Sequence, residues 1–211
     1  GGIGQALQGA LEARGASVTG LSRRDTGLDL SDEANTEGQL SALSGPFDAI
    51  LVASGALEIN GAHPEKALSQ LTQSAFLDQF IVNAAGPALI LKHAPRLLPK
   101  DRPSQFAALS ARVGSIGDNK IGGWYSYRAA KAALNQIIHT GAIELARTHK
   151  QAICVALHPG TVQTPFTAKY LGRHASVPAA HAALNLLSVL EGLGPDKTGQ
   201  FFDWAGKPVP W

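Results

Sequence analysis

Several residue types are scarce in this chain of 211 residues, and each scarcity argues against a class of protein. The single cysteine, Cys154, cannot form an intrachain disulfide and is too few for most cysteine metal sites, so we expect no metal. It lies in an apolar run and is predicted to be a buried strand residue. Positive charge is also sparse, because the net charge is only +2 and no run of Lys and Arg exceeds two residues. We therefore expect no nucleic-acid partner.

Long apolar stretches and methionine are missing as well. No apolar run reaches the roughly 18 residues of a membrane-spanning helix, and no signal peptide is recognisable, so we expect no membrane partner and a cytoplasmic location. Charged residues make up 16% of the chain, below the usual ~25%, which suggests much buried surface and a subunit interface. Because the chain lacks methionine and opens on Gly1-Gly-Ile-Gly4, we interpret its first residue as an internal point of a longer protein.

What the chain does contain is an alternation of short apolar runs with helical stripes. Continuous apolar runs at 47–53, 104–110 and 151–157 predict buried parallel strands, and further strands are predicted at 17–21 and 200–204. Helices are predicted over 3–14, 31–43, 73–98, 123–148 and 179–191. The alternation predicts an α/β fold over residues 1–211, a single domain with a Rossmann-like, doubly wound parallel sheet.

Tyr127 and Lys131 are four residues apart in a predicted helix, which places both side chains on one face. A lysine ammonium beside a tyrosine favours the phenolate and lowers the phenol pKa from about 10. Such a tyrosine could give a proton to a newly formed alkoxide. The spacing also arises by chance, and a packed tyrosine beside a solvated lysine is the alternative.

Polar and small residues follow the predicted strands at Ser22, Ser54, Ser110 and Pro159-Gly160. Parallel sheets bind ligands at the carboxyl ends of their strands, so we expect these positions to converge with Tyr127.

Asn83 also belongs to this convergence, because Pro87 has no N–H to offer the Asn83 carbonyl. We expect a kink there and a water on the freed carbonyl. An ordinary helix break with a solvated asparagine is the alternative.

Two stretches suggest a dinucleotide. Gly1-Gly-Ile-Gly4 is similar to the second half of a glycine-rich turn, in which a pyrophosphate rests on a helix N-terminus. The alternative is a flexible N-terminal tail, which could have the same sequence. Ser22, Arg23 and Arg24 close the strand predicted over 17–21, where an acidic residue would bind a free ribose 2′-hydroxyl. Their donors and positive charge suit a 2′-phosphate instead, which favours NADP over NAD. The alternative is a solvated basic loop.

In this order and spacing, the motifs resemble those of the short-chain dehydrogenase/reductase family. Six motifs carry the resemblance: Gly2-Ile3-Gly4, Asp29-Leu30, Ala53-Ser54-Gly55, Asn83, Tyr127-x-x-x-Lys131 and Pro159-Gly160-Thr-Val162-Gln-Thr164. The stretch 122–127 and the ending at 202–208 are similar to the C-factor branch and its sniffer-type carbonyl reductase relatives.

The resemblance implies a role for each motif. Tyr127 would be the general acid or base, Lys131 would lower its pKa and hold the nicotinamide ribose, and Asn83 would anchor a relay water. Val162 and Thr164 would contact the carboxamide, and the remaining motif residues would contact the cofactor elsewhere. The family also implies a small carbonyl or alcohol substrate, NADP with NAD as a possibility, and a homodimer or homotetramer.

Three departures from the family pattern limit this reading. The strand before the glycine turn is absent from this sequence, and Ala53-Ser54 replaces the usual asparagines. Ala111 stands where the family's catalytic serine is expected, which leaves Ser110, Ser115 or no serine to complete the site. We therefore keep two functions open. One is an NAD(P)-dependent oxidoreductase, and the other is a weakly catalytic or non-catalytic regulatory or signalling protein that binds the cofactor.

Overall fold

A computed structural model describes residues 1–170 and 175–211 of the protein. Within the described residues, the main sheet has four parallel strands in the order β1-β2-β3-β6. Their bounds are β1 (Ala49–Val52), β2 (Ser104–Leu109), β3 (Ala152–His158) and β6 (Phe201–Asp203). Because all four run the same way, their carboxyl ends meet at one edge of the sheet. Cys154 lies buried in β3, as predicted.

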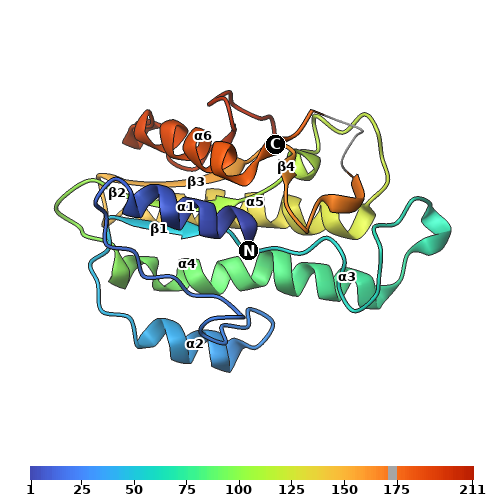
Figure 1. Cartoon of the computed structure of the whole chain (residues 1–211), viewed down its shortest axis with the longest axis horizontal. Coiled ribbons are helices and arrows are strands. Elements are labelled where there is room, and N and C mark those ends of the chain that lie inside the picture. The colour runs from blue at the N-terminus through green and yellow to red at the C-terminus, as the bar shows by residue number, and fades with distance from the viewer. Residues whose placement is uncertain (171–174) are drawn as a thin grey trace.

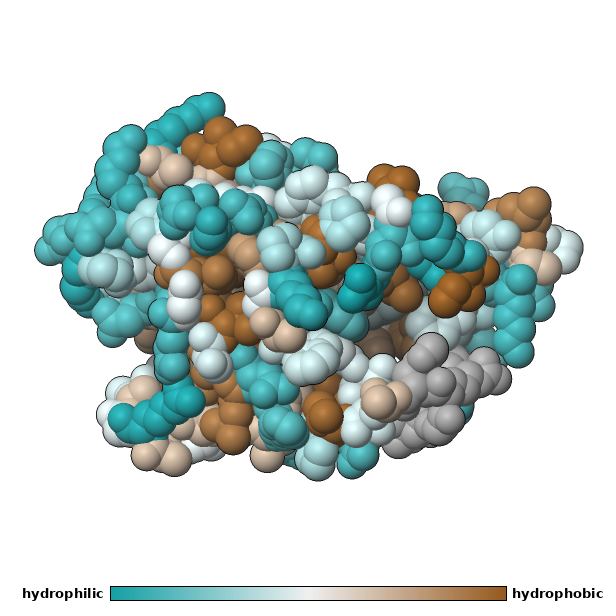
Figure 2. All heavy atoms as spheres, turned by 90° about the horizontal axis from the view of Figure 1, so that it is seen from above, coloured by the Kyte–Doolittle hydropathy of each residue, from teal (hydrophilic) through white to brown (hydrophobic). Residues whose placement is uncertain are grey.

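Helices cover both faces of this sheet (Figure 1). On one side lie α1 (Gly2–Glu12) and α6 (Ala179–Glu191), and on the other α2 (Glu33–Ser41), α4 (Gly86–Leu97) and α5 (Tyr125–Leu145). Seen from the α6 side, the surface mixes apolar patches with polar side chains (Figure 2).

The core alternates along the strands as this layering requires. Phe106 and Ala108 of β2 face the α4–α5 layer, whereas Ala107 between them faces the α1–α6 layer. Both faces of the sheet are thus buried, which explains the continuous apolar runs in the sequence. The predicted doubly wound arrangement is confirmed.

The long helix predicted over 73–98 is interrupted at the expected place. It consists of α3 (Gln73–Phe80), a π-helical segment η2 (Ile81–Ala85) and α4. Gly86 donates its N–H to the Ile81 carbonyl, five residues back rather than four. This wider turn ends just before Pro87, where the proline ring removes a backbone donor. The disturbance predicted from Pro87 therefore takes the form of a π-bulge.

By length and composition, the continuous helix Gln73–Leu97 could cross a membrane. The expectation from the sequence concerned continuous apolar runs, and polar residues interrupt this helix, so the expected lack of a membrane partner stays a prediction. In the fold, 39% of the helix's apolar window is buried, and it packs against α5 and the sheet. Its buried polar side chains include Gln79 and Asn83, which bond to the chain around them.

The strand predicted over 17–21 is wrong, because this segment is irregular. A strand needs a neighbour to pair with, and the described residues provide none on the free edge of β1. After β3 the chain forms a short parallel pair, β4 (Val162–Gln163) with β5 (Val177–Pro178), and a 3₁₀ turn, Ala168–Tyr170.

Candidate active site

Tyr127 and Lys131 lie in the first two turns of α5 and are both buried. The Lys131 ammonium lies 5.9 Å from the centroid of the Tyr127 ring and donates a hydrogen bond to the Leu109 carbonyl at 2.9 Å. That carbonyl is at the carboxyl end of β2. The Tyr127 ring is flanked by Trp124 and Phe166, with centroids 6.2 and 6.4 Å away. The two side chains therefore meet at the predicted edge of the sheet, and the solvated-lysine alternative is excluded.

Burial governs the electrostatics of this pair. It raises the pKa of Tyr127 well above its usual range and lowers the pKa of Lys131 to about 7. The expected lowering of the Tyr127 pKa by Lys131 is therefore not what this geometry produces. The reason is that the tyrosine is buried, and loss of solvation disfavours its phenolate.

Asn83 is fully buried beside the same strand ends. Its Oδ1 accepts from the Ala56 N–H at 3.1 Å, and its Nδ2 donates to the Ala56 carbonyl at 2.8 Å. A Cβ on Gly55 would lie 2.9 Å from Asn83 Oδ1 and 3.6 Å from Lys131 Nζ, so only glycine fits between them. The structure thus brings Asn83 and Lys131 together beside Gly55, and the solvated-asparagine alternative is wrong.

Neither candidate serine offers a free hydroxyl proton in this conformation. Ser110 donates to Asn135 Oδ1 at 2.6 Å in the protein interior. Ser115 donates to the Pro210 carbonyl and accepts from the Asp118 N–H. A hydroxyl has one proton to donate, so each would have to break its present bond to polarise a substrate. Whether either serine serves stays a prediction.

The residues predicted to hold a dinucleotide also come together at this edge. A Cβ on Gly2 would lie 2.8 Å from Thr164 Cγ2, and one on Gly4 would lie 3.6 Å from the Ala53 side chain. The Ser54 hydroxyl is buried and has no partner within the described residues. The close glycine approaches and the orphaned hydroxyl fit a bound dinucleotide, with the α1 N-terminus available for its pyrophosphate.

The structure also places several other residues of the predicted cofactor set. Pro159 and Gly160 follow β3, and Gly160 has a positive φ of 77°, with the Trp204 ring where a Cβ would point. Val162 is buried in β4. Leu30 packs against Gly86 of α4, whose Cβ, if present, would lie 2.7 Å from the Leu30 Cβ.

The basic loop of Ser22, Arg23 and Arg24, which follows the segment 17–21, is largely exposed. Ser22 donates to Asp25 at 2.7 Å, and Arg24 pairs with the same carboxylate at 2.9 Å. The hydrogen bonds from Ser31, with a smaller contribution from the charge of Arg23, lower the pKa of Asp29. The role of these side chains toward a 2′-phosphate stays a prediction.

Sequence reasoning missed two buried polar residues that support the site, Glu65 and Gln79. One oxygen of the Glu65 carboxylate accepts from the Ser126 N–H in the first turn of α5, at 3.2 Å. The Glu65 carbonyl accepts from the N–H of Trp124, which holds the left-handed φ of 55° that starts the helix. No local pattern marks Glu65, whereas the four-residue spacing of Gln79 from Asn83 is a usable signal.

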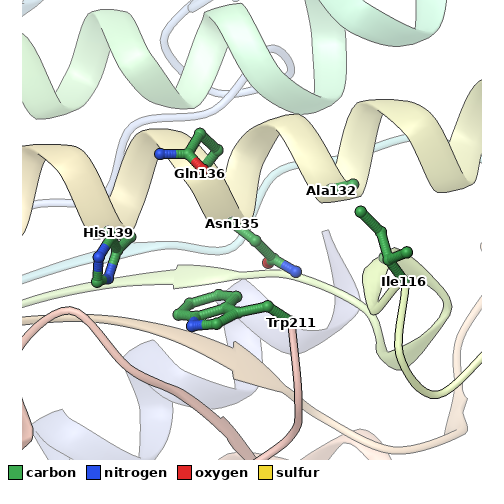
Figure 3. A pocket seen from close by; sticks show the side chains of 7 residues that line it. Ile116, Ala132, Asn135, Gln136, His139 and Trp211 are labelled. Atoms are coloured by element: carbon green, nitrogen blue, oxygen red, sulfur yellow. The ribbon is translucent and has the colours of Figure 1, made fainter.

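A cavity of about 270 Å³ lies on another face of α5 (Figure 3). Asn135, Gln136 and His139 of α5 line it together with Trp211. Tyr127 is not among its lining residues. Because Asn135 bonds Ser110 from this side, the cavity lies behind the candidate site rather than over its reactive groups.

Comparison with known proteins agrees with this geometry. A family model described as enoyl-(acyl carrier protein) reductase matches residues 1–189. A solved structure from Burkholderia multivorans, titled a short-chain dehydrogenase/reductase with bound NADP, is 26% identical, with a TM-score of 0.83. The matched region spans 100% of this chain and 95% of the Burkholderia chain. The chain belongs to the short-chain dehydrogenase/reductase family.

Other members of the short-chain dehydrogenase/reductase family differ in what their names describe. C-signal from Myxococcus xanthus is 35% identical over 148 residues, which are 69% of this chain and 84% of that protein. A 1-hydroxy-2-glutathionyl-2-methyl-3-butene dehydrogenase from Rhodococcus is 27% identical over 190 residues, 89% of this chain and 80% of that one. The Sniffer carbonyl reductase of D. melanogaster, at 21% identity and a TM-score of 0.71 over 98% of this chain and 83% of its own, shares the fold.

The buried Lys131 makes stability depend on pH. Between about pH 7 and 10.5, the folded protein binds fewer protons at this group than the unfolded chain, so the stability contributed by this group rises with pH. Lys131→Met should therefore raise the free energy of unfolding more at about pH 6 than at about pH 9, by roughly 2–3 kcal/mol. Urea denaturation at both pH values measures this difference. An equal gain at both, or a larger one at the higher pH, would contradict the assigned burial.

Proposed function

We propose that this protein is an NADP-preferring oxidoreductase that transfers hydride between the nicotinamide and a small carbonyl or alcohol substrate. The observation that carries the proposal is that Tyr127 and Asn83 both lie near Lys131 at the carboxyl edge of the sheet. The family membership and the NADP bound to the Burkholderia relative support it. The basic residues Arg23 and Arg24 support the preference for NADP over NAD.

The chain's own groups suit the reductive direction. When bound, the nicotinamide supplies hydride to the carbonyl carbon. A tyrosine is protonated at neutral pH even at its usual pKa of about 10, and burial raises the pKa of Tyr127 further. Its hydroxyl can therefore give a proton to the oxygen as negative charge develops there. Lys131, with a pKa of about 7, lies beside the ring and can stabilise the phenolate that remains. The rings of Trp124 and Phe166 exclude water from this position.

A regulatory or signalling protein with little catalysis is the second candidate. Two observations favour it: Ala111 at the expected serine position, and the engagement of both nearby serine hydroxyls with other acceptors. The similarity to C-signal is consistent with it. We favour the enzyme because losing one donor at a reacting oxygen typically costs about 10²–10³ in rate and leaves activity measurable.

We also propose that the protein is a cytoplasmic homodimer or homotetramer. Leu77 and Phe80 of α3 and Ile143 of α5 are about half exposed, with exposed fractions of 54%, 47% and 54%. Apolar side chains this exposed on neighbouring helices suit burial against a second copy.

Tyr127→Phe tests the proposed proton donor. With NADPH and a panel of aldehydes and ketones, the variant should lose about 10²–10⁴ in kcat, because it lacks the hydroxyl proton. NADPH consumption followed by absorbance measures the rate, and a fluorescence titration should show NADPH affinity within about twofold of wild type. Tight NADPH binding without turnover by the wild-type protein would overturn the enzyme proposal and favour the regulatory one.

Ala111→Ser tests whether a serine is missing. A hydroxyl at this position should raise kcat by about tenfold or more, because it would add a donor at the reacting oxygen. Ser110→Ala and Ser115→Ala are the matched controls, and each should leave kcat within about threefold of wild type. A loss in either control as large as that of Tyr127→Phe would show that this serine already serves.

Arg23→Ala tests the cofactor preference. Removing the guanidinium should weaken NADPH binding by about tenfold or more and change NADH binding little, because only NADPH carries the 2′-phosphate. Titration of the variant with each cofactor measures the two affinities. Equal losses for both cofactors would count against a phosphate-binding role.

A further inference from the structure

We propose that Gln79 is a positioning residue that fixes the Asn83 amide and, through it, the loop beside Lys131. The inference rests on the proposed function and assigns a further residue to the same site. Gln79 lies on the last turn of α3, one turn before Asn83, and only 5% of its surface is exposed. It contacts the site only through Asn83 and the neighbouring loop in the hydrogen bonds described below.

The two amides form one buried hydrogen-bond network. Asn83 Nδ2 donates one proton to the Ala56 carbonyl and the other to Gln79 Oε1, at 2.8 and 2.7 Å. Gln79 Nε2 donates to the Leu57 carbonyl at 2.9 Å, which fixes the glutamine in turn. Both protons of the Asn83 amide are thus used, and its oxygen is held by the Ala56 N–H. A fully satisfied amide network has one orientation, because flipping either amide would set donor against donor.

The position of Gln79 in the helix gives this bond its importance. Gln79 belongs to the α-helical turn, whereas Asn83 belongs to the π-helical segment that follows. The Gln79–Asn83 bond therefore spans the change from the α-helical to the π-helical hydrogen-bond pattern. Loss of the bond would free Asn83 to move against Gly55, which has no room to spare between Asn83 and Lys131.

The experiment compares Gln79→Met with a matched control, Gln105→Met. Methionine keeps the length of glutamine but removes its hydrogen bonds. Gln105 donates to the Leu190 carbonyl at 3.0 Å on the other face of the sheet, remote from the site. We expect Gln79→Met to lower kcat by about tenfold, with KM for NADPH changed less than about twofold, and Gln105→Met to leave both unchanged.

A double-mutant cycle then separates positioning from general destabilisation. If Gln79 acts through Asn83, adding Gln79→Met to Asn83→Ala should lower kcat by less than about twofold further. An equal loss in both backgrounds, or no loss in the wild-type background, would overturn the proposal. Should Gln79→Met not fold, Gln79→Glu keeps an acceptor for Asn83 while losing the donor to Leu57. Its kcat should then fall in the wild-type background but not in Asn83→Ala.

A second readout does not depend on turnover. The Ala56 amide proton is held by Asn83, so Gln79→Met, or Gln79→Glu in its place, should raise its hydrogen-exchange rate by about tenfold or more, while Gln105→Met should not. Unchanged exchange at Ala56 would overturn the inference even in an active enzyme. Faster exchange in a protein that turns over no carbonyl substrate would support the positioning by Gln79 and reject the proposed reaction instead.

Discussion

The burial of the Lys131 ammonium is the constraint on which the site depends. A buried cation is costly unless it is hydrogen-bonded, and here the Leu109 carbonyl at the end of β2 supplies that bond. The contact requires α5 to lie close against the strand ends. A Cβ on Gly114 would lie only 2.7 Å from the Lys131 Cβ, whereas one on Gly55 would lie 3.6 Å from Lys131 Nζ, an ordinary contact distance. Gly114 therefore makes room for the lysine, and the helix that carries Tyr127 is placed by the same contact.

This burial also sets the chemistry. Desolvation moves the two pKa values apart, so the tyrosine keeps its proton while the lysine can lose its own near neutral pH. A protonated tyrosine beside a reacting carbonyl is the form needed to donate a proton. The burial that raises the Tyr127 pKa would also keep water from competing for the proton.

The sequence predicted most of the fold, because buried parallel strands and amphipathic helices leave strong local patterns. It also placed Tyr127 and Lys131 on one face and a disturbance near Pro87. Three features were out of reach or misjudged. The segment 17–21 has strand-like composition, yet strand formation depends on a neighbour in space. Glu65 reaches a partner 61 residues away. The Tyr127 pKa was judged from its neighbouring charge alone, whereas burial, a property of the whole packed site, dominates it.

The central claim is that this buried tyrosine–lysine site carries out hydride transfer to a carbonyl substrate. The most direct measurement follows the hydrogen itself. The protein is incubated with NADPH deuterated at the nicotinamide C4 position and with ketones, and the alcohols are analysed by mass spectrometry. The account predicts deuterium on the carbinol carbon of the product. Bound NADPH that retains its deuterium, with no labelled alcohol from any ketone, would contradict it.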